Sequence, residues 1–163
     1  GHQPWCDADR VGLVGLSLGA LAAASEDAAR PCRAVALWAP VFDMTRVFQQ
    51  TARTGLRALL DHQGWVPYRG LRVGKAFIDQ LDAVDAGECL AASQAPLLVC
   101  HSRVDDVVSY AEGRAYVERC EEIGRTCDLE PFENANHDFL EYPDRQRLLQ
   151  RTLHHCREHL LDE

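Results

Sequence analysis

Four short apolar runs, separated by segments of helical character, constrain the fold of this chain more than any other feature. Three of them are almost continuously apolar, namely VGLVGL (11–16), AVALW (34–38) and APLLVC (95–100). The fourth, TCDLEPF (126–132), is more polar. Continuous apolar runs are typical of parallel strands that are covered on both faces. The segments between and after them predict helices at 17–28, 109–123 and 143–160. This alternation indicates an α/β fold, with three α/β/α layers around a mainly parallel sheet.

Two of these helices carry further expectations. Gly124 is expected to end the helix at 109–123, because glycine adopts the left-handed conformation common just after helices. In the last helix an apolar side is expected to face the core, and it consists of Leu148, Leu149, Leu153, Cys156 and Leu160.

The stretch from Val41 to Ser93 interrupts the alternation, because a single crossover helix needs far fewer residues. It predicts a helix at 45–60, then a short hairpin around Arg69-Gly70, and then another helix. An insertion near the carboxyl ends of parallel strands is more often a lid than a separate domain. We therefore expect one domain over residues 1–163, with 41–93 as a lid or cap.

Composition excludes several classes of partner. The net charge is -8 and no cluster of Lys and Arg is present, so nucleic acid is not expected as a partner. No apolar run approaches the roughly 20 residues that span a bilayer. The seven cysteines are scattered without a Cys-x-x-Cys pair, which argues against a zinc cluster or a disulfide framework. They predict mostly buried thiols and a cytoplasmic location, and no metal or cofactor is expected.

Ser17 lies in the sequence Gly15-Leu16-Ser17-Leu18-Gly19, between the first predicted strand and the first predicted helix. A sharp turn of this kind needs small residues around a strained central residue. Both glycines are expected to let the helix approach the strand. The free N–H groups at the start of the helix would face a developing negative charge. A Gly/Ser turn without any catalytic role explains this stretch equally well.

Candidate partners for Ser17 occur later in the chain. A serine nucleophile needs a base, and the base needs an orienting acid. In α/β folds these lie on loops after later strands, in the order Ser, acid, His. Asp105 follows the third apolar run and His137 follows the fourth. The sequence therefore predicts a catalytic triad of Ser17, Asp105 and His137.

Alternatives to these assignments remain. Asp106, next to Asp105, and Asp43, just after the second strand, are rival acids. His101, at the end of a strand, is more simply a structural, hydrogen-bonding histidine. The last helix carries three histidines that are expected to be solvated surface residues, namely His154, His155 and His159. The spacing of His155 and His159 would suit a metal pair, but no third ligand is nearby. Cys100 lies within a strand, which makes it a remote candidate for a nucleophile.

These motifs resemble the α/β-hydrolase superfamily, in particular its serine esterase and peptidase-like branches. GLSLGA is similar to the nucleophile elbow of that family, HSRVDDVVS to its acid loop and NANHDF to its histidine loop. Ser102 replaces a usual glycine and Ser109 a usual proline, and neither change removes a catalytic group. The insertion GWVPYRGLRVGKAFID is more loosely similar to the lid hairpin of cinnamoyl and feruloyl esterases and of monoacylglycerol-lipase-like relatives.

The resemblance implies a serine hydrolase that cleaves a small or medium acyl ester through an acyl-enzyme on Ser17. The backbone N–H of Leu18 would be one donor of the oxyanion hole. Apart from the resemblance, the aromatic residues Phe42, Trp65 and Tyr68 are candidates to line an acyl or aromatic pocket. Trp38 is a further candidate, which core packing explains at least as well. The alternatives are a serine peptidase or thioesterase of the same fold, or a truncated domain without activity.

The same resemblance covers only the back half of the family's fold. Strands before the elbow, and the His-Gly loop with the second oxyanion N–H, are expected upstream of Gly1. The expected partner is a small-molecule ester, and self-association into a homo-oligomer stays open.

Overall fold

The structure is a computed structural model that describes residues 7–44, 46, 56–68, 70–81 and 83–161. It divides into two compact units. The first unit, called here the sheet unit, consists of Gly1–Phe42 and Ala86–Glu163. The second unit is Asp43–Asp85.

The sheet unit contains a four-stranded sheet in the order β1-β2-β5-β6. All neighbouring strands are parallel, so their carboxyl ends meet at one edge of the sheet. The predicted α/β fold is therefore confirmed. The strands are β1 (Gly12–Leu16), β2 (Ala34–Trp38), β5 (Leu97–Ser102) and β6 (Cys127–Phe132).

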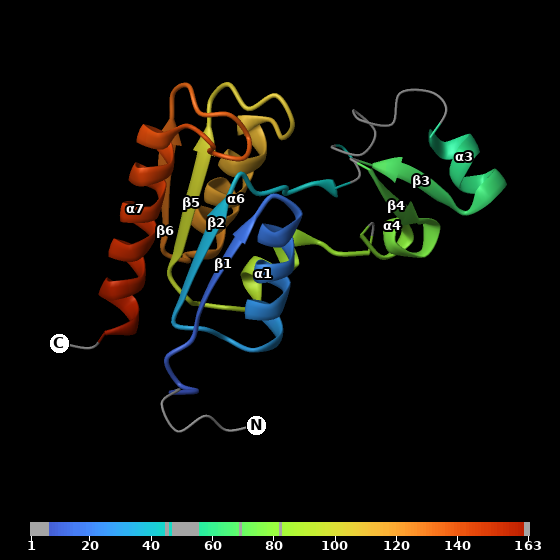
Figure 1. Ribbon diagram of the computed structural model, residues 1–163. Coiled ribbons are helices and arrows are strands. Elements are labelled where there is room, and N and C mark those ends of the chain that lie inside the picture. Colours follow the sequence, from blue (N-terminus) through green and yellow to red (C-terminus); the bar gives the residue numbers. More distant parts are fainter. Residues whose placement is uncertain (1–6, 45, 47–55, 69, 82, 162–163) are drawn as a thin grey trace. The chain divides into compact units, whose positions relative to one another are not determined.

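Helices cover both faces of this sheet (Figure 1). Three of them pack against one another on one face, and they are α1 (Leu18–Ala29), α5 (Ala86–Ala91) and α6 (Tyr110–Ile123). The other face is covered by α7 (Tyr142–Leu160), which contacts β2 and β5. As expected, α6 ends at a left-handed glycine, Gly124, with a φ of 71°.

The packing of α7 differs from the sequence prediction. Its buried residues are Leu148, Thr152 and His155, whereas Leu149 and Leu153 are exposed. Leu148 is buried as predicted, but the prediction is wrong for Leu149 and Leu153, because two polar residues on the inner face find partners within the sheet unit. The Trp38 Nε1–H donates to Thr152 Oγ1 at 3.0 Å. His155 Nε2 lies 3.2 Å from the Pro96 carbonyl oxygen, so this histidine is not a solvated surface residue.

Burial also differs between strands. The strands β2 and β5 are buried almost throughout, whereas β1, at the edge of the described sheet, is only partly covered. Val14 of β1 is 48% exposed. The expectation of burial on both faces therefore holds for the central strands and is wrong for β1.

The second unit contains an antiparallel hairpin flanked by two helices. Its elements are α3 (Leu56–Gln63), β3 (Trp65–Tyr68), β4 (Leu71–Gly74) and α4 (Lys75–Leu81). The predicted hairpin and the helix after it are both present. Of the helix predicted at 45–60, Arg46 and residues 56–60, the first part of α3, are helical, and residues 45 and 47–55 lie outside the described residues. A small core of Leu60, Val66 and Ile78 holds the unit together.

The described cysteines are all free thiols. Cys100 and Cys120 are buried, as predicted, but the other four are only partly covered, and Cys6 lies outside the described residues. Within the described part of the chain, no cluster of His, Cys, Asp or Glu is arranged to hold a metal ion. No helix in that part combines the length and the apolar character that crossing a membrane requires.

Candidate active site

Ser17 occupies a strained turn between β1 and α1. Its φ of 56° and ψ of -120° lie outside the regions that non-glycine residues ordinarily adopt. The Ser17 N–H donates to the Trp38 carbonyl at 2.8 Å, which fixes the turn to the end of β2. Strain of this kind is typical of a serine raised above the sheet edge for chemistry.

The two flanking glycines have different roles. A Cβ atom at Gly15 would collide with the backbone of Gly19 and Ala20, whereas one at Gly19 would meet nothing within 4 Å. Gly15 is thus required for the close approach of strand and helix, as expected. The same expectation was wrong for Gly19, which contributes its backbone to the contact.

Leu18, the predicted oxyanion donor, is the first residue of α1. The first N–H groups of a helix have no acceptor within the helix. They also lie at the positive end of the helix dipole. The Leu18 N–H is therefore suited to an oxygen that gains negative charge next to Ser17.

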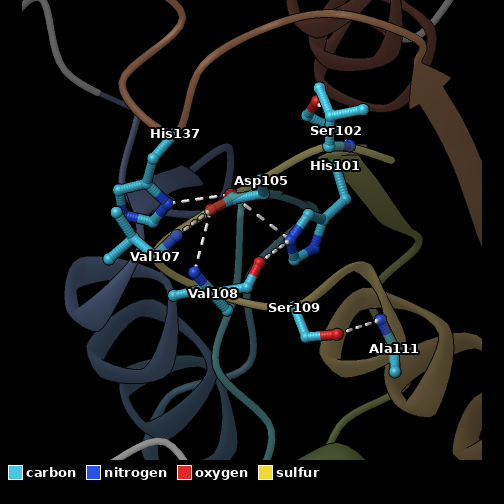
Figure 2. Close-up of polar contacts among 9 residues, drawn as sticks. His101, Ser102, Asp105, Val107, Val108, Ser109, Ala111 and His137 are labelled. Carbon is cyan, nitrogen blue, oxygen red and sulfur yellow. Dashed lines mark hydrogen bonds and ion pairs between the residues drawn. The ribbon is translucent and has the colours of Figure 1, made fainter. Parts of the chain in front are cut away.

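Asp105 and His137 form a direct contact between two loops of the sheet unit. Asp105 lies on the loop after β5 and His137 on the loop after β6. The His137 Nδ1 atom is 2.8 Å from Asp105 Oδ2 (Figure 2), and both side chains are almost fully buried. Because a carboxylate oxygen accepts, Nδ1 carries the hydrogen and Nε2 keeps its lone pair. This is the tautomer of a general base.

The carboxylate of Asp105 is held by a set of donors. The backbone N–H groups of Val107 and Val108 donate to Oδ1 at 2.9 and 2.8 Å. Burial raises the pKa of Asp105, but hydrogen bonds from His101, His137 and these two N–H groups outweigh it. The pKa of Asp105 therefore lies well below its ordinary value, and the group stays ionised beside His137.

The loop that carries His137 is fixed by a turn of its own. The Asn136 side chain accepts the N–H of Leu140 at 2.9 Å, and Phe139 has a φ of 50°. The ring of Phe139 is buried and packs edge-on against Phe132 at 5.1 Å between centroids. These contacts anchor the loop to the core beneath α7.

The two rival acids have different local surroundings. Asp106 is exposed. Asp43 belongs to the second unit, and its carboxylate accepts the N–H of Arg46 at 2.9 Å. Asp105 is the candidate acid that lies in direct contact with His137, at 2.8 Å.

The residues predicted to bind substrate are divided between the units. Phe42, in the sheet unit, packs edge-on against Tyr116 at 5.2 Å. Trp65, in the second unit, lies under the guanidinium of Arg72 at 4.5 Å from the ring centroid. Tyr68 is the last residue of β3, and its side chain lies outside the described part of the structure.

Two features of the acid loop were not anticipated. Arg103 Nε donates to Glu133 Oε1 at 2.9 Å and so ties the acid loop to the histidine loop. The opposite charges of Arg103 and Glu133 on these two loops were the sequence signal that could have predicted this ion pair. The hydroxyl oxygen of Ser109, which stands where a proline is usual, accepts the N–H of Ala111 at 3.3 Å and caps α6 (Figure 2).

Serine hydrolases with an α/β-hydrolase fold share this arrangement of residues. They have a strained serine at the first turn of a helix and a buried Asp–His pair at the same edge of a parallel sheet. The chain belongs to the Prolyl oligopeptidase family, whose model matches residues 1–163. A search of curated proteins gives no match.

Solved structures show the same fold. The chain is similar to the esterase domain of a Rhodothermus marinus protein, with a TM-score of 0.71 and 20% identity over 91% of this chain. It is also similar to a puromycin-hydrolysing peptidase of Mycobacterium tuberculosis, with a TM-score of 0.74 and 15% identity over 96% of this chain. A third match is Est1E from Butyrivibrio proteoclasticus, with a TM-score of 0.66 and 14% identity over 87% of this chain. The chain spans 61%, 23% and 60% of these three structures.

Proposed function

We propose that the chain carries the catalytic site of a serine hydrolase that cleaves a carboxylic ester with a small or medium acyl group. The observation that carries the proposal is the buried contact between Asp105 and His137 at 2.8 Å. It orients an imidazole whose free nitrogen is suited to take a proton from a serine. Ser17, strained at the same edge of the sheet, is the proposed nucleophile.

In the proposed reaction the Ser17 oxygen attacks the ester carbonyl carbon while His137 Nε2 takes the hydroxyl proton. The Leu18 N–H stabilises the negative oxygen of the tetrahedral intermediate. The bond to the leaving alcohol then breaks, and His137 returns the proton to that alcohol. A water molecule, deprotonated by His137, then attacks the acyl carbon. The bond from that carbon to the Ser17 oxygen breaks, His137 returns the proton to Ser17, and the acid is released.

Labelling with a fluorophosphonate probe tests the nucleophile, because only an activated serine reacts. The protein, expressed as its gene encodes it, should be labelled and should hydrolyse p-nitrophenyl acetate. S17A should lose both properties while it keeps the circular dichroism spectrum of the parent. S25A, on the same helix, is the matched control and should retain both. Labelling of S17A at the parent's level would contradict the assignment.

A serine peptidase is the second candidate, favoured by the family to which the chain belongs and by the peptidase among the structural matches. The esterase domain among the structural matches supports ester substrates, and one structure of Est1E has an aromatic acid, ferulic acid, bound. Aminoacyl p-nitroanilides and p-nitrophenyl esters separate the two candidates. An amide rate equal to the ester rate would favour the peptidase, and a protein inert to both substrates and to the probe would be the non-catalytic alternative.

A further inference from the structure

A second histidine lies against the carboxylate of the candidate acid. His101, in β5, is fully buried, and its Nε2 is 2.9 Å from the Val108 carbonyl oxygen and 3.5 Å from Asp105 Oδ2. A carbonyl oxygen can only accept, so Nε2 carries the hydrogen. The Nε2–H group thus donates to the Val108 carbonyl, and the Asp105 carboxylate lies 3.5 Å from the same nitrogen.

The rest of the His101 ring is enclosed by α6. A Cβ atom at Gly113 would lie 2.5 Å from His101 Nδ1, so the glycine lets the helix backbone pack against the ring. The ring of Tyr110 stands edge-on at 5.8 Å. His101 Nδ1 is buried without a hydrogen-bond partner among the described residues. A proton there would lack an acceptor, and the neutral form with hydrogen on Nε2 fits this site.

We propose that His101 is a positioning residue, which holds the Asp105 carboxylate in place for His137 from the other side. The two imidazoles meet the same oxygen, Oδ2, at 3.5 and 2.8 Å (Figure 2). Val108 completes the arrangement, because its N–H binds Asp105 and its C=O binds His101. The backbone of the acid loop is thereby bonded both to the carboxylate and to the histidine beside it. This inference rests on the proposed function.

The proposal has an electrostatic consequence. An N–H group aimed at a carboxylate stabilises its negative charge. Without that donor, the Asp105 charge would hold the protonated His137 more tightly, and the pair would bind a proton at higher pH. Tyr110 of α6 is a further titratable group that the described structure gives in contact with the His101 ring, and the Arg103 guanidinium in turn lies 4.9 Å above the Tyr110 ring.

The test compares H101Q with H101M, which have side chains of similar length, with and without an N–H donor. H101M should lower kcat by about 10–100-fold, because a small misplacement of catalytic groups has effects of this size. KM should change little, and the acidic limb of the kcat/KM profile should move to higher pH. H101Q should recover most of kcat and the parent's pH profile.

H155M is the matched control, because His155 is also buried and bonds to a backbone carbonyl, that of Pro96. It should lower thermal stability and leave the pH profile unchanged. A folded H101M with the parent's kcat and pH profile would overturn the proposal. So would an H101Q variant that behaves like H101M.

If H101M does not fold, nitrogen NMR of the protein without substitutions tests the contact between His101 and Asp105. The hydrogen of His101 should reside on Nε2, and its signal should move in D105N. A hydrogen on Nδ1, or no response to D105N, would overturn the inference. Failure of the unmodified protein to react with the fluorophosphonate would instead count against the proposed function, and the NMR result would still report on the contact.

Discussion

At the scale of single residues, Gly15 and Gly19 share one motif and differ in what surrounds them. Gly15 lies against the backbone of α1, whereas Gly19 has open space at its Cβ position. G15A forces the helix away from the strand, so we expect a loss of about 1–3 kcal/mol in stability and a large loss of activity. G19A should change stability by less than about 1 kcal/mol. Urea denaturation of both variants checks this, and equal losses would refute the packing argument.

Asp105 should make the stability of the protein depend on acid pH. The pKa of its carboxyl is lowered in the folded protein, whereas an unfolded aspartate titrates near about 3.9. The folded state therefore gains stability from Asp105 that is complete above about pH 5 and is lost as the pH falls below about 4. D105N should be less stable than the parent at pH 7, and its stability should fall less between pH 6 and pH 3. Denaturation curves at both pH values test this, with D106N as the exposed control; parallel losses in D105N and the parent would contradict it.

The sequence predicted one of the two histidine contacts of Asp105. The order of Ser17, Asp105 and His137 along the chain predicted that the last two residues would lie on neighbouring loops, because parallel strands end at one edge. The second contact of Asp105, with His101, was not predicted. It depends on how close α6 approaches β5 at Gly113, and no local pattern encodes that distance.

At the scale of elements, a buried ion pair connects α1 with the turn that leads into β6. Arg125 Nη2 donates to Asp27 Oδ2 at 2.8 Å, and both side chains are 1% exposed. R125M leaves the Asp27 carboxylate buried without its partner, so we expect a loss of about 3–5 kcal/mol in the free energy of unfolding. The double variant D27N/R125M should be more stable than R125M, because it also removes the uncompensated charge. R114M, which breaks the exposed pair with Glu118, should change stability by less than about 1 kcal/mol. Similar losses in R125M and R114M would show that burial does not matter here.

The elements themselves were predicted unevenly. The central strands β2 and β5 were found because their continuous apolar runs reflect burial on both faces. The helix α5 was missed because six residues are too few to show a helical period. The inner face of α7 was predicted only in part, correctly at Leu148, because Thr152 and His155 are buried on that face by partners that are distant in the sequence.

The molecule as a whole divides into two compact units. The second unit, Asp43–Asp85, has its own core and is inserted between β2 and α5. It lies within the segment 41–93 that the sequence predicted to be a lid. We propose that it acts as one, and that it selects substrates while the sheet unit supplies the chemistry.

This proposal predicts a change in chain-length preference without loss of basic activity. Trp65 and Tyr68 are aromatic residues of β3, and replacing both by alanine removes apolar surface that a long or aromatic acyl group would contact. Each buried methylene of such a group contributes about 0.8 kcal/mol, so the kcat/KM for p-nitrophenyl octanoate should fall by more than about tenfold relative to that for the acetate. F77A, which removes an exposed ring of α4, is the control and should leave the ratio of the two rates unchanged. An unaltered ratio in the W65A/Y68A variant would mean that the hairpin does not contact the substrate, and the second unit would then need another role.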